Sequence, residues 1–98
     1  MHVISRKKLV EFGLRHPASV SVLRVWFRRL RLAKWVSFAE LRADFSSADQ
    51  VGRRIVFNVG GNKFRLIAAV HFNRGKVYVR HVLTHAEYDQ QDWKEGSS

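Results

Sequence analysis

Two different spacings of apolar residues divide the chain near its middle. In the N-terminal half, apolar residues recur at the spacing of one helix face, at Val20, Leu23, Phe27 and Leu30. Pro17 suits the first turn of this helix. Residues 53–84 instead alternate between apolar and polar side chains, with the period of two that is typical of a half-buried sheet. The pattern predicts a helical half followed by a sheet.

Three shorter elements are predicted around the main helix. Residues 1–5 indicate an opening strand, and residues 5–15 indicate a short helix that ends ahead of the proline, which disfavours a helical residue before it. Residues 37–40 have the Ser-x-x-Glu pattern of a capping box. A third short helix is therefore expected over 37–45, followed by a loop at 46–50.

The dipeptides Gly60-Gly61 and Arg74-Gly75 divide the alternating region into three strands, because both permit turns with positive φ. Two-residue turns at these places predict an antiparallel meander in which residue 58 faces 63, 56 faces 65, 69 faces 80 and 65 faces 84. One face then packs on the helices, with Ile55, Phe57, Phe64, Leu66, Ala68, Val70, Phe72, Val77, Val79 and Leu83. His81 falls on that face too, where a hydrogen-bonded buried histidine is expected.

The opposite face of the predicted sheet is called the open face. It has a small apolar floor of Val56, Ile67, Ala69 and Val82, surrounded by Arg54, Asn58, Lys63, Arg65, His71, Tyr78, Arg80 and Thr84. Its cations have no carboxylate among them, and like charges side by side repel one another. A bound anion therefore explains this face better than the alternative, which is a solvated surface protected against aggregation.

The overall charge also points to an anionic partner. Eighteen Lys and Arg against eight Asp and Glu give the 98-residue chain a formal charge of +10, which favours a polyanion or an acidic protein as ligand. The length predicts a single domain over residues 1–98, with a polar tail at about 90–98. The absence of cysteine fits the reducing cytoplasm, and no apolar run reaches the ~20 residues of a membrane span.

Rings accompany these cations in the sequence. His71, Tyr78 and Tyr88 supply the surfaces on which nucleobases stack while Arg and Lys hold phosphates. The arginines of the second helix form a solvent-exposed surface in one interpretation. In the other, they bind RNA phosphates or an acidic partner protein. The remaining His and carboxylate residues lack the spacing of metal ligands, so metal catalysis is disfavoured.

Residues 84–89, THAEYD, close the alternating region. They predict a short helix capped by Thr84 that turns back over the open face, and the alternative is a helix start without further role. His85 and Tyr88 would share one side of this helix, next to the cations. A near-neutral base beside cations is what proton transfer at a phosphodiester requires.

The chain resembles HigB-type toxins of the RelE superfamily. The resemblance covers nearly the whole chain and is most specific in NVGGN at 58–62, Lys63 and Arg65, KVYVRHVLTH with Arg80, and the closing THAEYD. It implies an α+β, RelE-like fold in which N-terminal helices pack on one face of a small antiparallel sheet, made of a three-stranded C-terminal meander and an N-terminal strand.

The resemblance also implies a function. Such toxins belong to type II toxin–antitoxin pairs and are metal-independent endoribonucleases without a cofactor. They cleave mRNA, commonly in the ribosomal A site, through 2′-hydroxyl attack that gives a 2′,3′-cyclic phosphate. The implied partner is a HigA-like helix-turn-helix antitoxin, and operator DNA would be bound only through the antitoxin complex.

Site residues follow by matching positions to the places where the superfamily keeps its functional groups. Arg65 and Arg80 are expected to stabilise the charge on the phosphate. Lys63 is expected either to bind the phosphate or to take part in proton transfer with the base, and His85 with Tyr88 to act in acid–base chemistry and base stacking. The expected RNA contacts are Arg53, Arg54, Asn58, Asn62, His71 and Tyr78, although both asparagines could serve only the turn. A non-catalytic RNA-binding module and an interaction protein with an acidic partner remain the alternatives.

Overall fold

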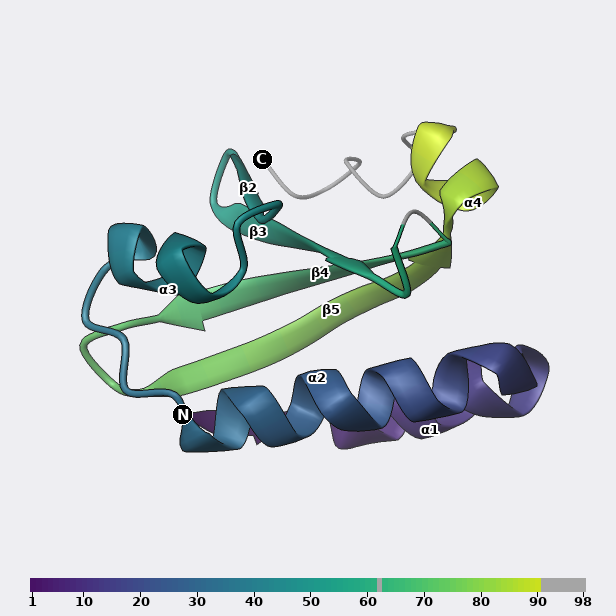
Figure 1. Cartoon of the computed structure of the whole chain (residues 1–98), viewed down its shortest axis with the longest axis horizontal. Helices are drawn as coiled ribbons and strands as arrows, with labels where there is room; N and C mark the ends of the chain where they lie inside the picture. The colour runs from purple at the N-terminus through teal and green to yellow at the C-terminus, as the bar shows by residue number, and fades with distance from the viewer. Residues whose placement is uncertain (62, 91–98) are drawn as a thin grey trace.

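The protein is built around a five-stranded sheet with the strand order β1-β5-β4-β3-β2 (Figure 1). A computed structural model describes residues 1–61 and 63–90 of the chain. The strands are β1 (His2–Ile4), β2 (Asp49–Val51), β3 (Arg54–Val59), β4 (Phe64–His71) and β5 (Lys76–Thr84). Neighbouring strands are antiparallel except for β1, which runs parallel to β5. The predicted α+β class, the meander and the opening strand are confirmed.

The far edge of the sheet differs from the prediction. Residues 46–50 were expected to form a loop, but β2 starts within them and pairs with β3, so that Gln50 faces Ile55. The strand has three residues, which is too short for alternation to show in the sequence. The sheet is therefore one strand wider than expected, and the parallel pairing of β1 with β5 makes it mixed.

The helices begin close to the predicted places, and all but the last cover one face of the sheet. They are α1 (Arg6–Arg15), the 3₁₀ helix η1 (Pro17–Ser19), α2 (Val20–Leu32), α3 (Phe38–Asp44) and α4 (His85–Asp89). α1 and α2 lie side by side along the sheet, whereas α4 projects from the far end of β5 (Figure 1). Ser37 caps α3 as expected, because its side chain accepts a hydrogen bond from the backbone N–H of Glu40.

The core lies between the sheet and α1, α2 and α3. Trp26 on α2 is 2% exposed and meets the ring of Phe57 edge-on at 5.4 Å, and Phe45 meets the same ring at 5.2 Å. Leu23 and Leu30 of the predicted apolar helix face are buried, but Val20 is 40% exposed. Trp26 completes the buried stripe in its place, since positions 23, 26, 27 and 30 lie on one side of a helix.

The turns of the meander are longer than predicted. Val59 pairs with Phe64, and His71 pairs with Lys76, so four residues rather than two separate the strands at each turn. Asn58 consequently faces Arg65, and residue 69 faces Tyr78. The predicted pairs 58/63, 56/65 and 69/80 are wrong by two positions, and a shift of two leaves each side chain on its predicted face. The predicted pair 65/84 is wrong by one position, because Arg65 faces Leu83.

A β-bulge in β5 changes the faces beyond it. Residue 68 pairs with Val79 and residue 67 pairs with His81, which leaves Arg80 as the additional residue. Val82 consequently packs in the main core, while Leu83 joins Val56 and Ile67 in the small cluster on the open face, and His81 is exposed. The predicted positions of His81, Val82 and Leu83 are wrong, because one inserted residue reverses the alternation along the strand.

Candidate functional site

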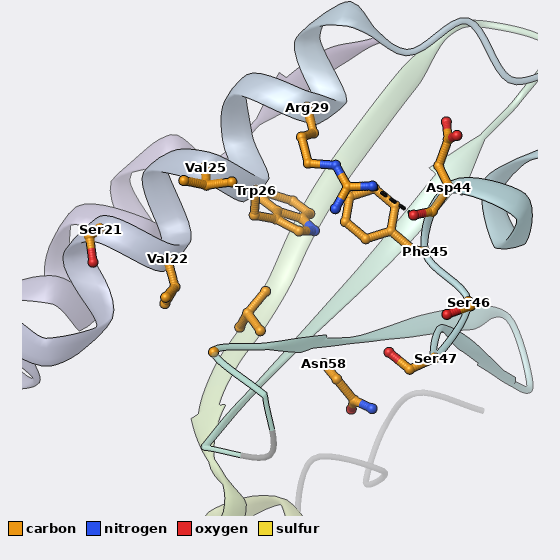
Figure 2. Close-up of a pocket in the computed structure, with 12 residues that line it drawn as sticks. Ser21, Val22, Val25, Trp26, Arg29, Asp44, Phe45, Ser46, Ser47 and Asn58 are labelled. Carbon is orange, nitrogen blue, oxygen red and sulfur yellow. Dashed lines mark hydrogen bonds between the residues drawn. The ribbon is translucent and has the colours of Figure 1, made fainter.

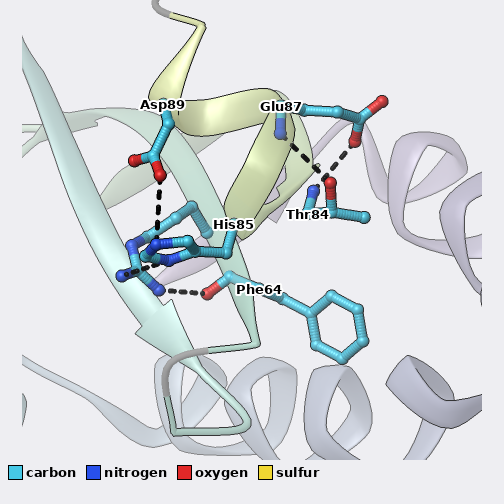
Figure 3. A network of polar contacts seen from close by, with 6 residues as sticks. Phe64, Thr84, His85, Glu87 and Asp89 are labelled. Carbon is cyan, nitrogen blue, oxygen red and sulfur yellow. Dashed lines mark hydrogen bonds and ion pairs between the residues drawn. The ribbon is translucent and has the colours of Figure 1, made fainter.

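The helix α4 is anchored over one end of the open face by local hydrogen bonds. The Thr84 hydroxyl accepts from the Glu87 N–H at 3.2 Å, and the Thr84 N–H donates to the Glu87 carboxylate at 2.8 Å (Figure 3). This capping box confirms the predicted helix and its cap. The His85 N–H donates to the Lys63 carbonyl at 3.1 Å, which ties the helix to the start of β4.

Arg65 lies beneath this helix and is buried. Its guanidinium donates to the Phe64 carbonyl at 3.2 Å and to Nδ1 of His85 at 3.1 Å, and it lies 5.5 Å from the centre of the Tyr88 ring. The side chain is only 8% exposed, so the expectation that it would be exposed is wrong. The reason is that α4 folds back over β4 and covers it. Burial of a guanidinium is unfavourable unless such contacts compensate for lost water.

His85 is held from a second side by Asp89. Nε2 of the imidazole lies 3.1 Å from the Asp89 carboxylate, and the two side chains are 52% and 61% exposed. Asp89 was not among the predicted site residues. Its spacing of four from His85 on the predicted helix is the signal that could have identified it.

A second group of predicted residues lies farther along the open face. The rings of His71 and Tyr78 meet edge-on at 5.2 Å, and the Arg80 guanidinium lies 5.7 Å from the centre of the Tyr78 ring. Arg80 and His71 are exposed and Tyr78 is half-buried. The open face thus holds two clusters: a helix cluster of Arg65, His85, Tyr88 and Asp89, and a strand cluster of His71, Tyr78 and Arg80.

The other predicted residues surround these clusters. Lys63 is exposed in the loop before β4, and Arg53 is exposed in the turn between β2 and β3. Arg54 and Asn58 are half-buried on β3, and Asn58 faces Arg65 across the strand pair. Asn62 lies outside the described residues.

Electrostatic effects are clearest at His81, beside the bulge. Partial burial lowers the pKa of its imidazole below the usual 6.5, and the nearby cations Lys8, Arg54 and Arg80 act in the same direction. These cations come from α1, β3 and β5 respectively. The charged surface therefore continues from the open face around the edge of β5 toward α1.

A hollow of about 410 Å³ opens on the helix-covered side, between α2 and the segment that follows α3 (Figure 2). Arg29 spans it, with its guanidinium 4.0 Å from the centre of the Phe45 ring and 2.6 Å from the Asp44 carbonyl. Nε1 of Trp26 is buried there without a hydrogen-bond partner among the described residues. None of the predicted catalytic residues lines this hollow, but Asn58, one of the expected RNA contacts, lies at its border.

The described residues also bear on metal binding and on membrane insertion. No group of three or more His, Cys, Asp or Glu side chains is arranged to hold a metal ion within residues 1–61 and 63–90. In the same part of the chain, no helix has the length and apolar character needed to cross a membrane.

Comparison with known proteins identifies relatives along most of the chain. Residues 19–91 match the family described as HigB_toxin, RelE-like toxic component of a toxin-antitoxin system. The mRNA interferase toxin HigB of Escherichia coli K12 is 35% identical over 92 residues, covering 91% of this chain and 88% of the relative, and the mRNA interferase HigB of Shigella flexneri has the same values. The mRNA interferase HigB of Escherichia coli O6:H1 is 31% identical over 93 residues, covering 92% and 90%. The chain therefore belongs to the HigB family of RelE-like toxins from toxin–antitoxin systems.

Proposed function

We propose that this protein is the toxin of a type II toxin–antitoxin pair and inhibits translation by cleaving mRNA as an endoribonuclease. The observation that carries the proposal is the environment of Arg65. It is a buried cation that no carboxylate of the described residues pairs with, and it lies beside an imidazole and a phenol ring. A buried charge without a counter-ion favours an anionic ligand, and a phosphodiester is an anion that the imidazole can act on.

Cleavage without a metal requires a base, an acid and a cation at the phosphate. The ribose 2′-oxygen attacks phosphorus while its proton passes to the base, and the bond from phosphorus to the 5′-oxygen breaks. The products are a 2′,3′-cyclic phosphate and a free 5′-hydroxyl. His85 and Tyr88 supply the acid–base groups of this reaction, and Arg65 supplies positive charge for the phosphate, together with Lys63.

RNA outside the reacting nucleotide is bound by the strand cluster and its neighbours. Stacking on His71 and Tyr78 is compatible with any base sequence, since every base has an aromatic face. The Arg80 guanidinium lies over the Tyr78 ring, and from there it can hold the phosphate of a nucleotide bound at this cluster. Arg54 and Asn58 extend the contact surface along β3, and Arg53 extends it into the turn before this strand.

The proposed partners follow from charge and family. A formal charge of +10 suits the ribosome, and we place the substrate mRNA in its A site. The antitoxin is a HigA-like helix-turn-helix protein with an acidic surface for this toxin, and operator DNA is bound through the complex of the two. The site of action is the cytoplasm.

Primer extension on a reporter message after brief induction of the toxin tests the proposal. New 5′ ends inside the coding region are expected, and they should disappear when His85→Ala is induced to the same level. Growth arrest with an intact message would instead support a non-catalytic RNA-binding module. Repeating the reaction on purified message with and without ribosomes separates ribosome-dependent from free cleavage.

Co-expression with the adjacent reading frame tests the partner. A stable complex and restored growth are expected, because an acidic partner would neutralise the basic surface. Recovery of a free toxin, with growth still arrested, would contradict the assignment of that reading frame as the antitoxin.

A further inference from the structure

The imidazole of His85 has both of its nitrogens engaged by other side chains (Figure 3). Nδ1 lies 3.1 Å from Nη2 of Arg65, and Nε2 lies 3.1 Å from Oδ2 of Asp89. Arg65 approaches from β4 and Asp89 from the next turn of α4. The ring is thus fixed between two charged groups of opposite sign.

These two partners determine where the ring carries its proton. A guanidinium has five N–H donors and no acceptor, so Nδ1 must accept from Arg65 through its lone pair. An ionised carboxylate only accepts, so Nε2 must carry the hydrogen that is donated to Asp89. The neighbours therefore select the tautomer with hydrogen on Nε2 and the lone pair on Nδ1.

A carboxylate that binds one N–H of an imidazole has a known consequence for the other nitrogen. It holds the tautomer and the orientation of the ring, and it stabilises the imidazolium that forms when the other nitrogen takes up a proton. We infer that Asp89 is a positioning residue and that Nδ1 of His85 is the atom that removes the 2′-hydroxyl proton, an inference that rests on the proposed endoribonuclease function.

Arg65 links this base to substrate binding. In the free protein its guanidinium covers the lone pair of Nδ1 at 3.1 Å, so the base is blocked. Phosphate oxygens are anionic and are stronger acceptors than a neutral imidazole. Donation from Arg65 to a bound phosphate thus releases Nδ1 next to the same nucleotide, and the base becomes available only when RNA is in place.

The proton balance of this step is complete without a further cofactor. The 2′-hydroxyl proton passes to Nδ1, the bond from the 2′-oxygen to phosphorus forms, and the bond to the 5′-oxygen breaks. The leaving 5′-oxygen takes a proton from the Tyr88 phenol, and the proton on Nδ1 then returns through water to the Tyr88 phenolate. Asp89 remains an ionised carboxylate throughout.

Nitrogen NMR of the histidine rings in the free protein tests the tautomer without any RNA. The expected spectrum of His85 shows hydrogen on Nε2 in wild type and in Asp89→Asn, because the amide oxygen still accepts while Arg65 keeps Nδ1 an acceptor. In Asp89→Ala only Arg65 still favours this tautomer, so a larger fraction of rings with hydrogen on Nδ1 is expected than in wild type. A wild-type spectrum with hydrogen on Nδ1 would overturn the inference, whether or not the protein cleaves RNA.

Cleavage kinetics test the role of the carboxylate. Asp89→Ala should lower kcat by about 10–100-fold, the range found when a group that orients a metal-binding histidine is removed. KM should stay unchanged because Asp89 does not contact RNA, and Asp89→Asn should lie between Asp89→Ala and wild type. Asp49→Asn serves as the matched control, since Asp49 is an exposed carboxylate on the edge strand β2.

Two results distinguish this inference from the proposed function. If wild type cleaves RNA and Asp89→Ala cleaves it at the same kcat, the role of Asp89 is wrong and the endoribonuclease function stands. If wild type cleaves no RNA in the presence of ribosomes, the function fails and the base assignment fails with it, while the NMR result still decides whether Asp89 positions the ring.

Discussion

The two faces of β4 are ordered by different forces. On the helix-covered face, Leu66 and residue 68 are fully buried against the side chains of β3, β5 and the helices. On the open face, Arg65 is ordered by a hydrogen bond to the Phe64 carbonyl, a hydrogen bond to His85 of α4 and a ring contact with Tyr88 of α4. The first face depends on many small apolar contacts, whereas the second depends on a few polar contacts with defined geometry.

The helix that covers the open face contributes little burial of its own. α4 has five residues and none of them is buried, so its position depends on the capping box and on the contacts of Arg65 and His85. The fold is thus stabilised mainly on one side of the sheet, and the proposed chemistry is concentrated on the other. Substitutions on the two faces should therefore affect different measurements.

The largest effect is expected from Phe57→Ala on the covered face. Phe57 is fully buried and contacts the rings of Trp26 and Phe45, so its loss should lower the free energy of unfolding by ~3–5 kcal/mol. Equilibrium urea unfolding measures this loss. Val25→Ala is the control, because Val25 is 55% exposed and should change stability by less than ~0.5 kcal/mol. Equal losses in both variants would contradict the assigned core.

Arg65→Ala should have the next largest effect, and mainly on cleavage. Loss of a preorganised donor at the reacting phosphate lowers kcat by ~10²–10³. Since Arg65 is buried, the free energy of unfolding should also fall by ~1–2 kcal/mol, as expected for lost hydrogen bonds to a charged group. Single-turnover cleavage and urea unfolding measure the two effects.

Arg65→Lys separates charge from geometry at the same position. It keeps the cation but cannot donate in two directions through a planar fork, so most of the loss in cleavage should remain. Full cleavage by both Arg65 variants would show that the helix cluster is not the reactive site.

Arg80→Ala should weaken RNA binding by about tenfold, the effect of one charge-assisted hydrogen bond of ~1.5 kcal/mol. Its side chain is exposed and contacts the Tyr78 ring, so kcat and stability should change little. A plot of the logarithm of RNA affinity against the logarithm of salt concentration should become shallower by about one unit, because one phosphate contact is lost. Arg24→Ala on α2 is the matched control, and an equal loss there would place the RNA across the helices instead.

The smallest effect concerns pH and His81. Its pKa lies below the usual 6.5 in the folded protein, so the unfolded chain binds this proton more readily. The stability that His81 contributes is therefore complete above pH 6.5 and is lost as the pH falls through its lowered folded pKa. Urea midpoints at about pH 7.5 and about pH 5 should fall less with acid in His81→Asn than in wild type. An identical decline would contradict the environment assigned to His81.

Local sequence patterns determined most of the secondary structure. The N-cap at Ser37, the capping box at Thr84, the proline before α2 and the alternation along β3 and β4 each reflect contacts between residues close in sequence. The family and the proposed function were also recognisable from these segments. The predicted turn lengths were wrong, but Arg65 and Tyr78 lie on the predicted face of the sheet, because a register shift of two residues preserves the face.

Only the tertiary structure decided the arrangement of the candidate site. The bulge at Arg80 depends on how β5 pairs with β4, and no glycine or other local signal marks it. The burial of Arg65 and the orientation of His85 depend on α4 folding back across a neighbouring strand. Such contacts join residues about twenty positions apart, so periodicity, which reports only the spacing of neighbours, cannot reveal them.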